Sequence, residues 1–211
     1  MHPHAETLWR GPRWTLAILL AVLGMLGPFS IDTYLPAFSG IASSLNASPV
    51  HMQQTLSAYL FGFAFMNLFH GALADSFGRR PVILWGLMAF TLASLGCALA
   101  QNVTQLIVFR AMQGLSCGAG VVVSRAIVRD IFPPTQAQKV MSQITIFFGL
   151  APAIAPIMGG WLFVSLGWHS IFWLLTAIGL ALWAVNFKML PESLHASQRQ
   201  PFDVSHLMHR S

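Results

Sequence analysis

Charged residues are scarce in this chain: Asp, Glu, Lys and Arg together make up only 8% of its 211 residues. Hydrophobic residues make up 55%, and the mean hydropathy is +0.66. A soluble domain of this size would be left with too little polar surface to cover its core. The composition therefore excludes a water-soluble globular domain and indicates a protein embedded in lipid.

Cysteine and dense metal-ligand motifs are also scarce. The two cysteines, Cys97 and Cys117, both fall within apolar runs, where we interpret them as packing residues that say nothing about a redox compartment. The eight histidines include two close pairs, His2 with His4 and His206 with His209, but no dense ligand motif such as His-Glu-x-x-His, so no metal or cofactor is expected. His70 lies in an apolar run, where a packed or interfacial position and a proton carrier are the alternatives.

Sequence features of soluble and membrane enzymes are missing. The chain has no Gly-rich phosphate loop ending in Gly-Lys-Ser or Gly-Lys-Thr, which leaves no visible ATP coupling. It has no paired intramembrane aspartates for a membrane hydrolase. The net charge is +5, yet no basic patch is interleaved with aromatic residues. We therefore expect neither an enzyme nor a nucleic-acid partner.

Long apolar runs dominate what is present. A bilayer-spanning helix needs about 20 mostly apolar residues, and six such windows cover residues 14–36, 50–74, 81–101, 104–129, 139–164 and 168–190. No Ala-x-Ala site follows the first window, so we interpret it as an uncleaved helix. One set of ends and loops holds the basic residues Arg10, Arg13, Arg79, Arg80, Arg129, Lys139, Lys188, Arg199 and Arg210. The opposite loops, at 37–49, 102–103 and 165–167, contain neither Lys nor Arg, which predicts an all-α polytopic protein with both termini cytosolic.

A short charged hairpin at residues 71–81 separates the second and third windows. Gly71 permits a close approach of helices, and Gly78 permits a tight turn. We expect Asp75 to accept hydrogen bonds from the backbone N–H groups that open the third helix, where the helix dipole also favours an anion. Arg79 and Arg80 are expected to hold this loop in the cytosol, and one of them could pair with Asp130 at the end of the fourth window.

The hairpin spacing Gly-x-Leu-Ala-Asp-x-x-Gly-Arg-Arg resembles the cytosolic signature of major facilitator superfamily transporters. Ser76 is the one departure, because the family usually has a basic residue there. The resemblance implies a charge cluster that latches one conformation during alternating access. That role falls on Gly71, Asp75, Gly78, Arg79, Arg80, Arg129 and Asp130. A solvated turn with a topological role alone is the alternative.

The fourth window carries Arg110, Gln113 and Gly114 on one side of a helix. Arg110 stands about 9 Å into this helix at 1.5 Å per residue, so it could snorkel to the periplasmic surface. The alternative is an intramembrane charge, which costs about 2.5–3.5 kcal/mol at a helix centre and usually faces a partner or a wet cavity. Gly114 and Gly118 add a small-residue strip for close packing. Arg-x-x-Gln-Gly resembles the fourth-helix motif of the superfamily, which implies proton coupling by Arg110 and Gln113.

Asp32 lies near the periplasmic end of the first window, at a depth that matches Arg110. A carboxylate there could load and release a proton as the cavity changes sides. The run Asp-x-Tyr-x-Pro resembles a first-helix motif of drug:proton antiporters, which implies a coupling role for Asp32. An interfacial aspartate at a helix end is the alternative.

The fifth window combines prolines and small residues. Two prolines four residues apart remove backbone donors and invite a bend, and Ala151, Ala155 and Gly159 form a stripe suited to tight packing. The pattern resembles the antiporter motif Gly-x-x-x-Gly-Pro-x-x-Gly-Gly, in the Ala-Pro-x-x-Ala-Pro form of the bicyclomycin-resistance (Bcr/CflA) branch. The motif positions are Gly149, Pro152, Ala155, Pro156, Gly159 and Gly160. A kinked packing helix without antiport significance is the alternative.

The resemblance covers about residues 14–194 and implies one half of a transporter. Superfamily members have twelve helices in two halves, each built from two inverted three-helix repeats. We therefore predict a cytosolic tail at 1–13, a six-helix half at 14–190 and the start of the central cytosolic loop at 191–211. The implied function is proton-coupled multidrug efflux across a bacterial-type inner membrane. Its partners would be lipid, protons, an amphiphilic small molecule and a second six-helix half. A truncated non-transporting fragment, a modulatory subunit and a small-metabolite carrier are the alternatives.

Overall fold

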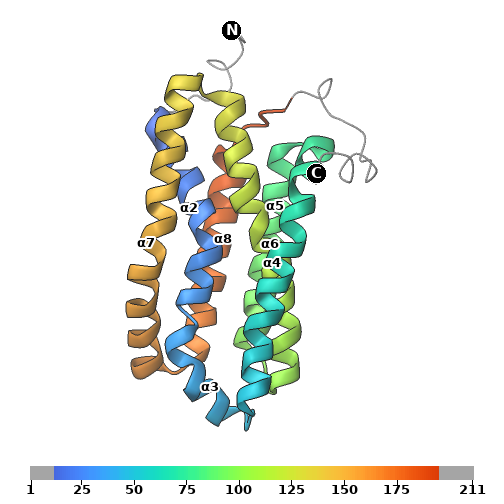
Figure 1. Ribbon diagram of the computed structural model, residues 1–211, viewed down its shortest axis with the longest axis vertical. Coiled ribbons are helices and arrows are strands. Elements are labelled where there is room, and N and C mark those ends of the chain that lie inside the picture. The colour runs from blue at the N-terminus through green and yellow to red at the C-terminus, as the bar shows by residue number, and fades with distance from the viewer. Residues whose placement is uncertain (1–11, 195–211) are drawn as a thin grey trace.

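The computed structural model describes residues 12–194, and every regular element within that range is a helix. Six of its helical segments are long and apolar enough to cross a membrane, which confirms the predicted polytopic all-α fold. Figure 1 shows them as a bundle of long, roughly parallel and antiparallel rods. The elements are α2 (Arg13–Asp32), η1 (Leu35–Ala37), α3 (Phe38–Ser44), α4 (Pro49–Phe77), α5 (Arg79–Ala98), α6 (Val103–Ile131), α7 (Pro134–Leu166) and α8 (His169–Met189). His206 and His209, and most of the predicted terminal tail and loop, lie outside the described residues.

The first span differs from its prediction. The apolar window at 14–36 was expected to end in a loop at 37–49, but the chain stays helical through η1 and α3 as far as Ser44. The long helix itself stops earlier, at Asp32, and a tightened turn follows in which Tyr34 N–H donates to the Ile31 carbonyl at 3.1 Å. Pro36, which has no N–H group, suits the first turn of the 3-10 helix that comes next. The first span is therefore two helical pieces joined by a turn at residues 33–34.

Helix packing follows the order expected of an inverted repeat. α4 packs along α6 and α7 packs along α2, so the second and fifth spans make equivalent contacts, while α5 packs on α8 and α2 on α6. Glycines bring two of these pairs together. A Cβ at Gly114 would collide with the backbone carbonyl of Tyr59 on α4, and one at Gly159 would collide with the carbonyl of Thr33 after α2. The small residues predicted on α6 and α7 thus lie at close helix contacts.

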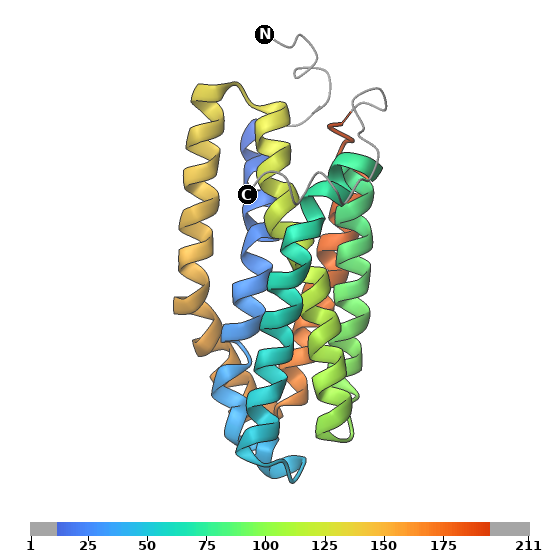
Figure 2. The same ribbon diagram turned by 45° about the vertical axis from the view of Figure 1, so that its right-hand side comes forward.

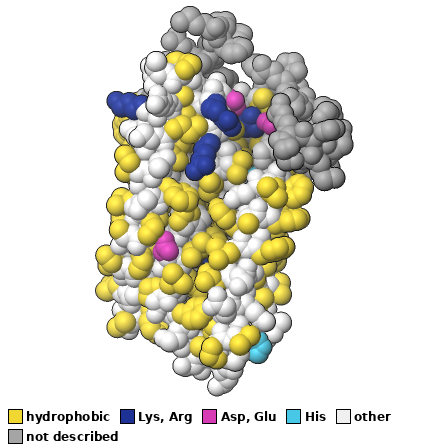
Figure 3. All heavy atoms as spheres, viewed as in Figure 1, with side chains coloured by type: hydrophobic (Ala, Val, Ile, Leu, Met, Phe, Trp, Pro, Cys, Tyr) yellow, Lys and Arg dark blue, Asp and Glu magenta, His cyan; other side chains and the backbone are white. Residues whose placement is uncertain are grey.

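The six spans are covered to different degrees. α2 and α6 are the most buried inside the bundle, whereas α4 and α7 are the least buried. Figure 2 shows α7 standing at one edge of the bundle and α4 in front of α6. Lys and Arg side chains gather near the end that carries both ends of the described chain, and hydrophobic side chains cover much of the rest of the visible face (Figure 3). We call these two ends the termini end and, opposite it, the α3 end.

Candidate functional site

The turn between α4 and α5 consists of a single residue, Gly78, which ends one helix and precedes the next. Its φ of 105° and ψ of 156° lie where side chains are disfavoured, so the expected need for glycine at this turn is confirmed. The expectation for Gly71 is wrong. A Cβ there would stand 3.8 Å from Cγ1 of Val122, which is ordinary contact, so α4 and α6 do not approach closely enough at this level to require glycine.

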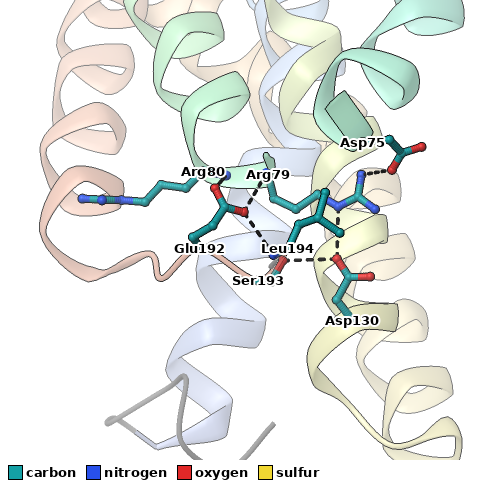
Figure 4. A network of polar contacts seen from close by, with 7 residues as sticks. All are labelled: Asp75, Arg79, Arg80, Asp130, Glu192, Ser193 and Leu194. Atoms are coloured by element: carbon teal, nitrogen blue, oxygen red, sulfur yellow. Dashed lines mark hydrogen bonds and ion pairs between the residues drawn. The ribbon is translucent and has the colours of Figure 1, made fainter. Parts of the chain in front are cut away.

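Arg79 is the centre of an ionic network at the termini end. Its side chain is nearly buried, and its Nη1 lies 2.5 Å from Oδ1 of Asp75. Its Nε donates to Oδ2 of Asp130 at 3.0 Å, which confirms the expected pairing of one hairpin arginine with Asp130. Figure 4 shows the guanidinium between these two carboxylates, which come from α4 and α6. One side chain from α5 therefore joins three helices.

Glu192 caps the start of α5, a role that sequence reasoning gave to Asp75. The backbone N–H groups of Arg79 and Arg80 donate to its Oε1 at 2.9 Å and its Oε2 at 3.3 Å. Asp75 lies in the last turn of α4 and pairs with the Arg79 side chain instead, because α4 continues to Phe77 (Figure 4). The segment after α8 thus reaches the first turn of α5, where the helix dipole favours a carboxylate.

Residues next to this network differ in whether their side chains belong to it. Ser193 joins it, since its Oγ donates to Oδ2 of Asp130 at 3.2 Å. Arg80 points away and donates to the Phe187 carbonyl at 2.6 Å, with its guanidinium 5.6 Å from the Phe187 ring. Arg129 is exposed and forms none of the network's ion pairs, because successive residues of α6 point to different sides of the helix. The structure therefore brings Asp75, Arg79 and Asp130 together and leaves Arg129 outside.

Arg110 is fully buried in α6, with an exposed fraction of 0%. Snorkelling to the surface is thereby excluded, and the intramembrane interpretation holds. Its Nη1 donates to Oε1 of Gln113 at 2.6 Å, and Nε2 of Gln113 donates to Oγ of Ser94 on α5 at 2.8 Å. Nε and Nη2 of Arg110 have no hydrogen-bond partner. The two predicted coupling residues of α6 thus form one buried chain of polar contacts.

Aromatic rings stand where a carboxylate was expected. The Arg110 guanidinium carbon lies 4.5 Å from the ring centroid of Tyr34 and 4.2 Å from that of Tyr59. Asp32, the last residue of α2, is partly buried and makes no hydrogen bond or ion pair within the described residues. Sequence reasoning missed both tyrosines, because an aromatic residue in an apolar helix gives no sign of what it faces.

On α7 the motif residues divide by position. Ala151, Ala155 and Gly159 are buried, and Gly159 faces the turn after α2. The other glycines are not sterically required: a Cβ at Gly149 would meet nothing within 4 Å, and one at Gly160 would stand 3.8 Å from Pro36. The helix continues without interruption through Pro152 and Pro156. The structure thus supports the packing stripe of this motif.

A cavity of about 630 Å³ lies among α4, α5 and α6. Its wall is apolar apart from His70 and Ser116, and it includes the exposed side chains of Trp85 and Phe77. His70 is 4% exposed, so the structure favours the packed interpretation of this histidine. Both cysteines are buried and unpaired, as expected of packing residues. Within residues 12–194 no cluster of three or more His, Cys, Asp or Glu side chains could hold a metal ion.

Comparisons with known proteins define the class. The sequence profile of the Major Facilitator Superfamily matches residues 10–206, and the chain belongs to this superfamily of transporters rather than to a class of enzymes. It is 41% identical over 184 residues to a bicyclomycin resistance protein homolog of Haemophilus influenzae, covering 87% of this chain and 46% of that protein. It is 36% identical over 175 residues to the multidrug resistance protein MdtL of Escherichia coli, covering 83% of this chain and 45% of that protein. The chain therefore spans about half the length of the curated relatives it matches.

Solved structures show the same fold. A bacterial homolog of the human lysosomal transporter Spinster, in an inward-facing and occupied conformation, superposes with a TM-score of 0.72 at 17% identity, covering 87% of this chain and 45% of that one. The human organic anion transporter MFSD10 superposes with a TM-score of 0.68 at 23% identity, covering 91% of this chain and 51% of that one. The six helices thus have the arrangement of one half of a major facilitator fold.

Proposed function

We propose that this chain is the amino-terminal half of a proton-coupled multidrug exporter that works by alternating access in a bacterial-type inner membrane. The observation that carries the proposal is Arg110, a cation fully buried in α6 that pairs with no carboxylate of residues 12–194. Charges inside membrane spans are costly and mark ion or substrate pathways. The names of the relatives, bicyclomycin resistance protein homolog and multidrug resistance protein, support drugs as the substrate class.

Asp32 is the residue that would carry the proton. It is partly exposed and pairs with no side chain in the described part of the chain, so its carboxylate is free to gain and lose a proton. It lies two residues before Tyr34, whose ring contacts Arg110. Because opposite charges attract strongly in a medium of low dielectric constant, the ionisation state of this carboxylate would act on the Arg110 cation across the turn that carries Tyr34. Loading a proton on Asp32 would therefore change the forces on α2 and α6.

The network around Arg79 would latch one conformation. It joins α4, α5, α6 and the segment after α8 through Asp75, Asp130 and Glu192. All these contacts lie at the termini end (Figure 1), which we assign to the cytosol. Closing this end requires the network, and opening it requires the network to separate. Protonation of Asp32 at one end of the bundle would then alternate with closure of the Arg79 network at the other.

The uncovered faces of α4 and α7 support a second six-helix half as the partner. These two spans are the least buried of the six, and they lie in equivalent positions of the two repeats. A second half packed on them would enclose a cavity at the interface, which is where transporters of this architecture bind their substrates. We place the amphiphilic substrate there.

The test is drug-induced proton release from purified protein. It compares this chain alone with the chain joined to the part of the Haemophilus influenzae relative that it does not cover. We expect a signal only from the joined protein, and we expect Asp32→Asn to remove it while Asp203→Asn, a control outside the described residues, does not. An unchanged signal from Asp32→Asn would remove Asp32 from the mechanism.

A second assay separates export from the alternatives. Counterflow of drugs and of small metabolites shows which class of solute the joined protein carries. If metabolites exchange and drugs do not, the protein is a metabolite carrier. If neither exchanges and no protons are released, a non-transporting or modulatory role replaces the proposal.

A further inference from the structure

The two tyrosines of this chain both stack on Arg110. The chain has 16 phenylalanines and 7 tryptophans but only 2 tyrosines, and these are Tyr34 and Tyr59. Both are fully buried, and their ring centroids lie 4.5 Å and 4.2 Å from the guanidinium carbon. Tyr34 comes from the turn after α2 and Tyr59 from α4. The cation is thus held between rings from two separate spans, an arrangement we call the tyrosine clamp.

Hydroxyl groups explain why these rings are tyrosine. The Tyr34 hydroxyl lies 2.5 Å from Oγ1 of Thr55 on α4. The Tyr59 hydroxyl donates to the Gly27 carbonyl on α2 at 3.0 Å and lies 2.6 Å from Oγ of Ser30 on the same helix. Each ring is therefore anchored to the helix opposite its own. Phenylalanine would stack on the guanidinium equally well but would lack these anchors.

The clamp supplies much of what holds the guanidinium. Arg110 has one hydrogen bond, from Nη1 to Gln113, while its Nε and Nη2 have none. Contact with an aromatic face stabilises a desolvated cation, which offsets part of the cost of placing the charge inside the membrane. The two tyrosine rings therefore stabilise the buried cation in the place where a carboxylate was expected.

The turn that carries Tyr34 connects three elements. Asp32 ends α2, and Tyr34 follows two residues later. Between them, the Thr33 carbonyl is the atom against which Gly159 of α7 packs so closely that a Cβ would collide with it. The turn is therefore held by α7 on one side and stacked on Arg110 of α6 on the other. A shift of this turn would move Asp32 and the Tyr34 ring together.

We propose that Tyr34 and Tyr59 are positioning residues for proton coupling, and that Tyr34 transmits the state of Asp32 to Arg110 through the turn at residues 33–34. This inference rests on the proposed function, because it assigns the two rings a part in that coupling. The tyrosines do not carry the proton. They fix where the buried cation stands relative to the carboxylate that does.

The experiment uses the joined protein and measures drug binding and drug-induced proton release as functions of pH. We expect Tyr34→Leu and Tyr59→Leu to reduce proton release about tenfold, since typical coupling energies correspond to factors of this size. We expect Tyr34→Phe and Tyr59→Phe, which keep the rings, to restore most of it, with a shifted pH profile. Phe90→Leu is the matched control, because Phe90 is equally buried and stacks on no cation.

Thermal unfolding separates a coupling role from a folding role. Double-mutant cycles that combine Tyr59→Leu with Arg110→Gln test whether ring and cation interact. Leucine variants that match Phe90→Leu in abundance and melting temperature but lose proton release support the proposal. Leucine variants with wild-type proton release and an unshifted pH profile overturn this inference. The proposed function stands in that case, because the wild-type joined protein still releases protons. Silence from the wild-type joined protein overturns both.

Discussion

Two buried arginines, one toward each end of the bundle, are held in opposite ways. Arg79 pairs with Asp75 and Asp130, and its backbone N–H donates to Glu192. Arg110 pairs with no carboxylate and lies between the rings of two tyrosines. The first arrangement depends on partners that can be separated or screened. The second depends on the rings of neutral side chains, which salt screens far less. Arg79 is therefore suited to a latch that opens and closes, and Arg110 to a fixed reference charge.

Removing the fixed charge should have the largest effect. Arg110→Ala leaves Gln113 without its donor and removes the cation to which Asp32 would respond. We expect drug-induced proton release by the joined protein to fall about a hundredfold, toward the upper range of coupling energies. Retained release at wild-type abundance would show that proton coupling does not need the Arg110 charge, and the proposed contrast with Arg79 would then fail. The control is Arg125→Ala, an exposed arginine of the same helix.

Removing the paired arginine should act mainly on stability and conformation. Arg79→Ala leaves Asp75 and Asp130 without their shared cation, and we expect a loss of about 1–3 kcal/mol in the free energy of unfolding. Thermal unfolding of the purified chain in detergent measures it. Arg80→Ala is the control, since that side chain bonds only to the Phe187 carbonyl and ring. Equal losses for both variants would contradict the central place of Arg79.

The turn that presents Arg79 can be tested with two glycines. Gly78→Ala forces a side chain into a backbone with a φ of 105°, and we expect a loss of about 1–2 kcal/mol in stability. Gly71→Ala meets only ordinary contact at 3.8 Å and should change stability by less than about 0.5 kcal/mol. Thermal unfolding of the two variants side by side gives the answer. A reversed order would mean that helix approach, and not the turn, governs this hairpin.

Asp75→Asn should change stability only slightly. The Asp75 side chain is half exposed, so its pair with Arg79 is worth less than about 1 kcal/mol. Membrane insertion and abundance should stay normal, while transport by the joined protein should slow. High salt should weaken the same pair in the wild type and leave the tyrosine clamp unaffected. Normal transport rates for this variant would remove Asp75 from the latch.

Local patterns predicted much of this architecture. Apolar windows located all six spans, because the length of a membrane helix is set by the bilayer. The need for glycine at position 78 and the pairing of a hairpin arginine with Asp130 also followed from spacing and charge. The break after Asp32 and the helical residues of η1 and α3 were missed, because the apolar window ends at residue 36 and the run of small and polar residues beyond it predicts a loop.

Long-range partners could not be predicted in the same way. Glu192 caps a helix that begins 113 residues earlier in the chain, and no local pattern relates it to Arg79. The only available cue was a proline and an acid directly after the last helix. The tyrosine clamp was missed for a related reason: hydropathy places Tyr34 and Tyr59 inside the membrane but says nothing about the direction of their rings. Tertiary packing decides both.

The two buried cysteines make the chain convenient for spectroscopy. Cys97 and Cys117 are the only thiols, with exposed fractions of 0% and 2%. Reagents that label accessible thiols should therefore leave the wild-type protein unmodified. A cysteine placed at an exposed site, such as Trp85 near the termini end or Leu35 near the α3 end, would carry the only probe. Pairs of spin labels at such sites, one in each half of the joined protein, would report how far each end opens.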